Sequence, residues 1–260
     1  MTSDSPAPAS PRVQTGCAGP VDAWLLPRLQ MRFRPVSTAA DPPVARLGGQ
    51  PAWLATPTWP LSRALNSPMR FVGQFPVPGP ESRIAYLFVA DDDNGMVETF
   101  EPEAGENALL VQPGGVVPDF VTVTDAATGP SLWRRGATWQ DRVPVQLAVD
   151  LTPMDPAAEA VLDAEIDRRQ AEDGDLLDDL SDLDGSATDP IPPYSYLGGR
   201  MHLWQPHLPQ LAGDWRFFFQ LDGGEGQGPD DPYALNFGGG TGYALLSPDR
   251  REGRFFWDCV

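Results

Sequence analysis

Few residues in this 260-residue chain could support acid–base or metal chemistry, and the two histidines are the first candidates. His202 and His207 lie five residues apart in the stretch MHLWQPHLP. A shared metal would need a cysteine or a carboxylate close by, and none follows until Asp214 and Asp222. A hydrolase would have to use His202 with an acid from the same part of the chain, yet the sequence has no Gly-x-Ser-x-Gly nucleophile motif. We therefore expect the histidines to hydrogen-bond within a loop.

Two further stretches approximate ligand-binding loops but lack essential positions. Residues 90–101, ADDDNGMVETFE, place oxygen-bearing side chains at positions 3, 5, 9 and 12 of a calcium loop, but position 1 is Ala90 and a strand pattern precedes it. The run Gly238–Gly242 lacks the lysine and the following helix of a phosphate loop. Both patterns are more typical of hairpin turns. We therefore expect no catalytic residues, no metal and no cofactor, and an enzyme is less expected than a binding protein.

Composition narrows the chemistry further. The chain has no lysine, so its 18 basic residues are all arginine, against 36 acidic residues and a net charge of −18. Without lysine it can form neither a Schiff base nor a Walker A phosphate loop. The acidic balance repels phosphate backbones and anionic lipid headgroups, so we expect neither nucleic acid nor a membrane as a partner.

The cysteines and the N-terminal residues favour a cytoplasmic protein. Cys17 and Cys259 lie near opposite ends of the sequence, which is not the spacing of a disulfide framework or a cysteine zinc site. The first residues, MTSDSPAPASPR, match no signal peptide, and no apolar run is long enough for a membrane span. Residues 1–20 are rich in Pro, Ala and Ser and are predicted to be a disordered tail.

Short strands dominate the predicted secondary structure. Across 27–35, apolar residues alternate with Arg28, Arg32 and Arg34, which predicts a half-buried strand with a basic outer face. That face is either solvated or binds an acidic segment or an anionic ligand. Further strands are predicted at Met69–Phe75, Arg83–Asp91, Ala108–Gln112, Asp119–Thr124, Val143–Leu151, Trp215–Asp222, Tyr233–Phe237, Gly242–Ser247 and Gly253–Cys259. Of these, Arg83–Asp91 is apolar on both faces, as in the centre of a sheet.

One segment has the pattern of a helix. Asp155 and Pro156 match an N-cap and a first helical residue, and the following apolar residues can share one face to about residue 172. Residues 155–189 hold 13 acidic residues and two arginines, a net −11 of the total −18. We interpret 155–193 as an acidic, helical and partly disordered insertion. It is either a solvated linker or an acidic motif that folds onto a partner, or onto the chain's own Arg28–Arg34 face.

The most specific signal is an internal repeat. Residues 46–75 and 196–221 both begin with Leu-Gly-Gly, continue through a loop with Trp and Pro, and end in Arg-Phe-x-x-Gln. A further predicted strand follows each copy. The repeat predicts two equivalent halves, 21–154 and 194–260, separated by the insertion. The expected fold class is strand-rich α+β, a duplicated architecture of two similar mixed or antiparallel sheets with few helices.

The repeated side chains form the candidate binding site. In one interpretation, Gln74 and Gln220 satisfy backbone groups of their own glycine loops, because a buried amide needs partners for its donors and acceptors. In the other, the arginines and glutamines of both copies line a cleft between the halves, with tryptophans as its apolar walls. The candidate ligand-binding residues are Arg70, Gln74, Arg216, Gln220, Trp53, Trp59 and Trp204.

These motifs resemble a known bacterial family. ARLGGQPAW, TWP, PMRFVGQF and YLFVADDD, with LGGRMHLWQP and FFFQLDGG in the second half, are similar to the YwqG-like proteins, whose biochemical function is unknown. The resemblance spans about residues 25–260 and implies a β-rich α+β fold of two similar halves.

The first copy also resembles the N-terminal motif of the programmed-cell-death-2 proteins. The resemblance implies a link to ribosome biogenesis, where those proteins serve as chaperones for a ribosomal protein. They carry paired cysteines before the Pro-Met step, where this chain has Ala64, Leu65, Asn66 and Ser67. Without those cysteines, no zinc site is expected at this position.

Three functional hypotheses follow. The leading one is a cytoplasmic binding or chaperone-like adaptor that holds a peptide or protein segment in a cleft between the two halves. The second is an acidic immunity-type inhibitor, which would neutralise a basic toxin through the 155–193 insertion. The third is a hydrolase that uses His202.

Overall fold

Short strands make up most of the regular secondary structure. The computed structural model describes residues 26–36, 44–92, 95, 97–138, 141–171, 194–205, 208–223, 235, 237 and 240–259. One α-helix occurs among them, so the described chain is mostly β and not clearly α+β. The expected strand-rich character is confirmed. The predicted tail at 1–20, most of the strand predicted at Tyr233–Phe237 and the part of the insertion after α1 fall outside the described residues.

Ten strands form a single antiparallel sheet. They are β1 (Leu29–Pro35), β2 (Arg46–Gly48), β4 (Arg70–Val77), β5 (Arg83–Val89), β6 (Asn107–Gln112), β10 (Gln146–Pro153), β11 (Tyr196–Leu197), β12 (Arg216–Asp222), β13 (Thr241–Leu246) and β14 (Gly253–Asp258). Their order across the sheet is β14-β13-β12-β11-β1-β10-β2-β4-β5-β6. Two strand pairs lie outside it, β3 (Trp59–Leu61) with β7 (Thr122–Thr124) and β8 (Trp133–Arg135) with β9 (Arg142–Pro144).

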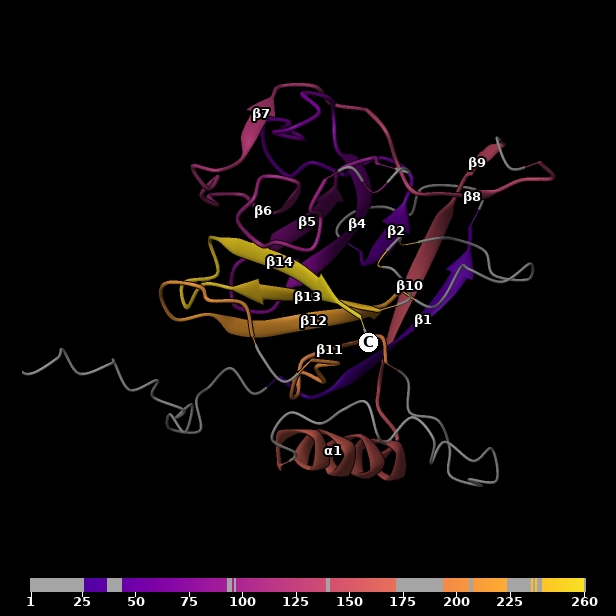
Figure 1. The fold of residues 1–260 in the computed structure, drawn as a ribbon, viewed down its shortest axis with the longest axis vertical. Helices are drawn as coiled ribbons and strands as arrows, with labels where there is room; N and C mark the ends of the chain where they lie inside the picture. The colour runs from indigo at the N-terminus through magenta and orange to yellow at the C-terminus, as the bar shows by residue number, and fades with distance from the viewer. Residues whose placement is uncertain are drawn as a thin grey trace, which may run out of the picture.

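The large sheet curls until its two ends lie side by side, with β14 next to β6 (Figure 1). The approach is close, because a Cβ on Gly253 would lie 2.5 Å from the carbonyl oxygen of Leu109. The inner face of the curl holds the main hydrophobic core. There the rings of Phe75 and Phe219, on β4 and β12, have centroids 4.1 Å apart. The space between the two ends of the sheet is therefore packed with apolar side chains.

Strand β5 lies between β4 and β6 and is buried on both faces. Ala85, Leu87 and Val89 belong to the main core, whereas Tyr86 and Phe88 belong to a second cluster on the outer face. The prediction of a central strand is confirmed. Apolar side chains on alternating faces of one strand thus connect two layers of core.

Strands β1 and β10 form the centre of the sheet and link its two ends. They pair antiparallel, with Arg32 opposite Asp150 at the middle of the ladder. Strand β1 also pairs with β11, and β10 also pairs with β2. Each strand therefore joins a part of the sheet that is distant from it in the sequence.

Helix α1 (Pro156–Ala171) confirms the predicted helix and packs below the sheet (Figure 1). Its N-cap is Asp155, whose Oδ1 accepts a hydrogen bond of 2.9 Å from the Ala157 amide. Ala158, Leu162 and Ile166 form its buried face, one helical turn apart. In the part of the chain that the structure describes, no helix has the length and apolarity needed to cross a membrane.

Candidate functional site

The two repeated glutamines lie in two separate loops and make matching bonds. The Oε1 atom of Gln74 accepts from the Ala52 amide at 2.9 Å, and its Nε2 donates to the Val44 carbonyl at 3.1 Å. In the second half, the Oε1 atom of Gln220 accepts from the His202 amide at 3.0 Å, and its Nε2 donates to a carbonyl at 2.9 Å. Both side chains are fully buried. Each glutamine therefore pins its own loop, and the structure does not bring the two onto one open surface.

The glycine pairs of the two LGG motifs have a conformational and a steric role. Gly48 and Gly49 have φ of 65° and 71°, and Gly199 has φ of 71°, a region that glycine enters at little cost. The amide of Gly49 donates to the carbonyl of Val145 at 3.1 Å, and that of Gly199 donates to the carbonyl of Leu26 at 3.1 Å. A Cβ on Gly48 would lie 1.9 Å from the Val145 oxygen. The glycines thus let the segments that precede β10 and β1 approach the loops.

A tyrosine that the sequence motifs did not single out completes each loop. Tyr86 pairs in register with Gln74, and its hydroxyl accepts from the Leu54 amide at 3.1 Å and donates to the Ala52 carbonyl at 2.8 Å. Tyr243 pairs with Gln220 in the same way. Burial raises the pKa of Tyr86 to about 12, so its hydroxyl stays protonated. The sequence signal was the tyrosine in the strand after each Gln strand.

The three candidate tryptophans are packing residues of these loops. Trp59 is fully buried, and its Nε1 donates to the Met69 carbonyl at 2.8 Å. Trp53 is partly buried and donates to the Ala127 carbonyl at 2.9 Å. Trp204 donates to a hydroxyl on β13 at 2.7 Å. All three indole N–H groups are therefore used within the protein, and the side chains belong to two different loops.

The two repeated arginines have different surroundings. Arg216 is partly buried at the start of β12. Arg70 is buried, with its side chain 1% exposed, and its guanidinium lies 3.6 Å from the carboxylate of Asp91. A buried guanidinium needs such a countercharge, because desolvating an unpaired charge is costly. Further arginines lie close to Arg70.

Arg70 lies at the base of a hairpin formed by β8 and β9, which extends from the sheet near the start of β10 (Figure 1). Three backbone hydrogen bonds of 2.9 to 3.0 Å hold that base. The amide of Phe71 donates to Pro130, the amide of Leu132 donates back to Phe71, and the amide of Val145 donates to Leu132. The hairpin is thus attached to β4 next to Arg70, and its first residue is Trp133.

Two guanidiniums share one carboxylate beneath this hairpin. Nη1 of Arg142 lies 2.8 Å from Oδ2 of Asp91, while Arg70 lies by the other carboxylate oxygen. The indole of Trp133 is close to both cations, with its centroid 4.6 Å from Cζ of Arg142 and 6.0 Å from Cζ of Arg70. We call Arg70, Asp91, Trp133 and Arg142 the arginine cluster.

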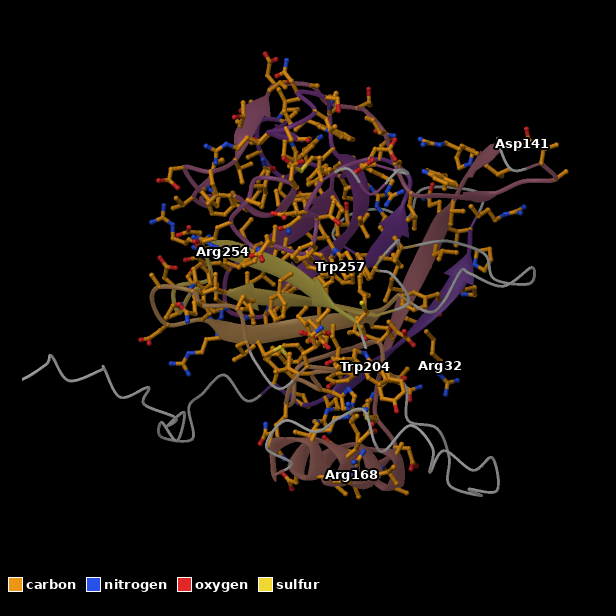
Figure 2. The ribbon with its side chains drawn as sticks, viewed as in Figure 1. Arg32, Asp141, Arg168, Trp204, Arg254 and Trp257 are labelled. Carbon is orange, nitrogen blue, oxygen red and sulfur yellow. The ribbon has the colours of Figure 1, made fainter. Side chains whose placement is uncertain are left out.

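The arginine cluster opens onto a cationic surface. The side chain of Arg142 is 43% exposed and that of Asp91 is 19% exposed. Arg134 is exposed on β8. Figure 2 shows Asp141 at the far end of this hairpin. The basic hairpin contrasts with a chain whose net charge is −18. Of these residues, Arg70 is the one that the sequence analysis had identified. The hairpin could have been recognised from WRR and a later arginine on either side of a glycine-containing turn.

The acidic helix binds Arg28, the residue that precedes β1. The buried guanidinium of Arg28 lies 2.9 Å from Asp163 and 3.3 Å from Glu159, both on α1. Arg200 adds a contact of 2.6 Å to Asp167. Several interpretations were left open for the acidic segment. For α1, the one that applies is folding onto the chain's own Arg28–Arg34 face, through the contacts with Arg28.

His202 is enclosed by α1 and two aromatic rings. Its side chain is fully buried, and Nε2 lies 3.0 Å from Oε1 of Glu165. The rings of Tyr194 and Trp204 each have a centroid 5.2 Å from the imidazole (Figure 2 labels Trp204). Burial alone raises the pKa of Glu165, but the adjacent His202, the charge of Arg169 and the Tyr194 hydroxyl together lower it to about 2. This arrangement fixes α1 and leaves His202 without access for a substrate. Sequence reasoning had not identified Glu165 as its partner.

A shallow pocket of about 190 Å³ lies elsewhere, between the loop at 55–58 and the turn at 114–117. Gln112 lines it, and none of the seven candidate ligand residues does. Among the residues that the structure describes, no three His, Cys, Asp or Glu side chains gather closely enough to hold a metal ion.

Comparison with known proteins gives no assignment, because no protein-family model, no curated protein and no solved structure matches the chain.

Proposed function

We propose that this protein is a non-catalytic adaptor that binds a segment of a partner protein at its arginine hairpin. We define the arginine hairpin as the arginine cluster together with the exposed Arg134 and the β8–β9 backbone. The observation that carries the proposal is an exposed cationic hairpin, anchored by the buried Arg70, on a strongly acidic chain. Arginine and tryptophan are the residues most enriched where binding energy concentrates in protein interfaces.

The proposal moves the binding surface away from a cleft between the two halves. Gln74 and Gln220 are buried in separate loops, and Phe75 packs on Phe219 between the halves. Of the residues expected to bind a ligand, Arg70 is the one that belongs to the proposed surface. A cytoplasmic setting, with neither nucleic acid nor a membrane as partner, remains part of the proposal on the grounds of composition.

The two alternatives have less support. An acidic inhibitor would present carboxylates to a basic toxin, but Glu159, Asp163 and Asp167 on α1 pair with the chain's own arginines. A hydrolase would need His202 at a surface, and the imidazole is fully buried beside Glu165. An adaptor needs neither of these groups to be accessible.

We further propose that the chain is an internal duplication in which the two copies exchange their first strands. The series β1, β2, β4, β5, β6 and the series β10, β11, β12, β13, β14 pair in matching order, except that β1 pairs with β11 and β10 with β2. Both Gln strands carry a register shift with one extra residue, between Phe71 and Gly73 and between Phe217 and Phe219. This scheme assigns β10 to the second copy, whereas the sequence placed it in the first half, 21–154. The resemblance to the YwqG-like proteins stays part of the proposal.

The adaptor proposal is tested by charge reversal of the hairpin. Proteins captured by the wild type are identified, purified and bound again one at a time. The variant Arg134→Glu/Arg142→Glu should reduce binding of the true partner by at least about tenfold, because a like charge at an interface costs more than 1 kcal/mol. Arg168→Glu, on the exposed face of α1, is the matched control and should bind within about twofold. A partner set that is unchanged by the hairpin variant, in a protein that still melts cooperatively, would contradict the proposal.

A further inference from the structure

Resting on the proposed function, we propose that the arginine hairpin binds its partner by strand addition, in which an extended segment of the partner pairs with the outer edge of β8. The segment is recognised mainly through its backbone amides and carbonyls. Its side chains alternate between an apolar one beside Trp133 and an acidic one beside Arg134. In the complex, the hairpin becomes a three-stranded sheet.

The hairpin is a sheet of only two strands. β8 and β9 have three residues each, and among the strands that the structure describes they pair only with each other. Figure 1 shows them extending away from the large sheet. A two-stranded ribbon is at most marginally stable in water, whereas a third strand adds a second row of backbone hydrogen bonds. The hairpin therefore gains stability from an added strand.

The register of the hairpin shows which backbone groups point outward from β8. The Gly136 amide donates to the Asp141 carbonyl at 2.9 Å, so these two residues form a hydrogen-bonded pair beside the turn. Hydrogen-bonded pairs alternate along an antiparallel ladder, so the next one joins Arg134 to its partner on β9. The N–H and C=O groups of Trp133 and Arg135 then point away from β9. The outer edge of β8 thus presents two amides and two carbonyls at the spacing of one side of a β-ladder.

The outer edge of β9 is a poorer template. By the same alternation its outward positions are Arg142 and Pro144, and proline has no N–H to donate. Proline on an exposed edge opposes the addition of another strand. Directly after Pro144 the chain is bound to the first glycine loop, because the Val145 carbonyl accepts from the Gly49 amide at 3.1 Å. The added strand is therefore assigned to β8.

The side chains of β8 set the preferred sequence of the added strand. Successive residues of a strand point to opposite faces. The indole of Trp133 is partly buried and lies on the same face as Arg142, with its centroid 4.6 Å from Cζ. Arg134 is exposed and belongs to the other face. An apolar residue beside Trp133 buries more of the indole, and an acidic residue beside Arg134 forms a cross-strand pair of opposite charge.

A second copy of this chain fits the edge less well than another protein. Antiparallel pairing of β8 with the β8 of a second copy, centred on Arg134, sets Arg134 opposite Arg134. Like charges directly opposite each other destabilise a ladder, and two of the three β8 residues are arginine. A neutral or acidic segment of another protein avoids this repulsion.

The test uses the full-length protein, isotope-labelled for NMR, and a short peptide in which Val and Glu alternate. Two further peptides carry N-methyl groups on every Val or on every Glu. In an antiparallel added strand the residue beside Trp133 directs its N–H toward β8, so methylation of Val should weaken binding by about tenfold or more. Methylation of Glu blocks the opposite edge of the peptide and should leave binding within about twofold.

Amide exchange locates the bound peptide on the protein. In the free protein the outward amides of Trp133 and Arg135 should exchange faster than the Arg134 amide, which bonds within the hairpin. The Val-Glu peptide at saturation should slow the two outward amides by at least about fivefold more than it slows Arg134.

A pair of variants tests the side-chain preference. Arg134→Glu should weaken binding of the Val-Glu peptide by about threefold or more, because a like charge then stands beside a Glu of the added strand. Arg168→Glu, exposed on α1, is the matched control and should bind within about twofold. If Arg134→Glu does not fold, the methylated peptides still decide the mode of binding, because they leave the protein unchanged.

The outcomes separate strand addition from the adaptor proposal. Equal binding of the two methylated peptides, or slowed exchange that misses Trp133 and Arg135, would overturn strand addition at β8. Blocking by methylated Glu alone would support it with the added strand parallel to β8. Self-association that the peptide competes with would replace the partner segment by a second copy.

Two results distinguish failure of one proposal from failure of the other. No binding of the Val-Glu peptide, with a hairpin-dependent protein partner still captured, would overturn strand addition and leave the adaptor. A captured partner set that Arg134→Glu/Arg142→Glu leaves unchanged, with the peptide still bound along β8 of the wild type, would overturn the adaptor and leave the strand-binding edge.

Discussion

The two glutamine loops have the same internal bonds but different covers. In the first half, the loop and the outer face of β4 and β5 are covered by Trp59 and the β3–β7 pair, in an apolar cluster. In the second half, the loop is covered by α1, whose apolar face packs on Tyr196 and which is also held by Arg28 and by the contact of Glu165 with His202. The two loops thus share the same internal hydrogen bonds but are covered by different elements. The comparison indicates that the glutamines stabilise the part of the fold that the two loops share, whereas the charged contacts of α1 occur in the cover of the second loop.

The two covers should respond differently to pH and to salt. Apolar burial depends weakly on pH and is strengthened by many salts, whereas ion pairs weaken with salt and with protonation of their carboxylates. The second half should therefore respond to acid and salt before the first. Substitutions in the shared loops and in the two covers should therefore have distinguishable effects on stability.

The largest effect is expected from removing either framework glutamine. Gln74→Ala and Gln220→Ala each leave a buried amide N–H and a buried carbonyl without partners and open a cavity, which together cost about 3–5 kcal/mol of unfolding free energy. Urea unfolding measures both. Gln205→Ala is the control, because its exposed amide makes one bond and should cost less than about 1 kcal/mol.

The two losses should agree with each other if the loops are equivalent. A difference of more than about 2 kcal/mol between Gln74→Ala and Gln220→Ala would mean that the covers, and not the shared bonds, decide the stability of the loops.

The next effect should be confined to the second half. Arg28→Gln removes a buried cation that binds Glu159 and Asp163, so docking of α1 should weaken by about 2–4 kcal/mol. Hydrogen exchange of α1 amides should accelerate while β5 amides keep their protection. Arg32→Gln, exposed on β1 four residues later, is the matched control and should leave α1 unchanged. Equal acceleration in β5 would show that α1 is not an independent cover.

The sequence predicted the longer elements because they have a readable period. Arg83–Asp91 was predicted as a central strand and forms β5, and the predicted helix begins and ends within a residue of α1. The predicted strand Val143–Leu151 is divided at Val145, whose amide bonds to Leu132 outside the sheet. Strands of two or three residues, such as β2 and β11, are too short to show a period and were not among the predicted strands.

The site was less predictable because it depends on contacts between distant segments. The repeat identified Gln74 and Gln220 correctly as a matched pair, and satisfaction of their own glycine loops was one of two open interpretations. Asp91 and Arg142 are separated by 51 residues, and their contact arises from the attachment of β8 to β4. Glu165 similarly meets His202 only because α1 folds back. No local pattern encodes such pairs, so a sequence without an alignment cannot rank them.

Acid should destabilise the second cover by a moderate amount. The pKa of Glu165 is lowered to about 2, against an ordinary value of 4.5. Its contribution is therefore complete above pH 4.5 and is lost as the pH falls toward 2, a loss of about 1–3 kcal/mol. Glu165→Gln should be less stable than the wild type at neutral pH, and the gap should close across this window. Trp59→Phe, which loses an indole hydrogen bond in the first cover, should show a gap without this pH dependence. A Glu165→Gln gap that stays constant to pH 2 would contradict the assignment.

The smallest effect is expected where an ion pair lies on the sheet surface. Arg34 and Asp150 are 3.4 Å apart on β1 and β10, but their side chains are 61% and 52% exposed. Water screens such a pair and the long arginine loses side-chain entropy, so a double-mutant cycle with Arg34→Ala and Asp150→Ala should give a coupling below about 1 kcal/mol. Arg28, six residues earlier, should couple to Asp163 by more than twice as much, because its guanidinium is buried. Similar coupling energies for the two pairs would mean that burial of Arg28 contributes nothing to holding α1. The ionic contribution to the second cover would then have to rest on Glu165 and His202.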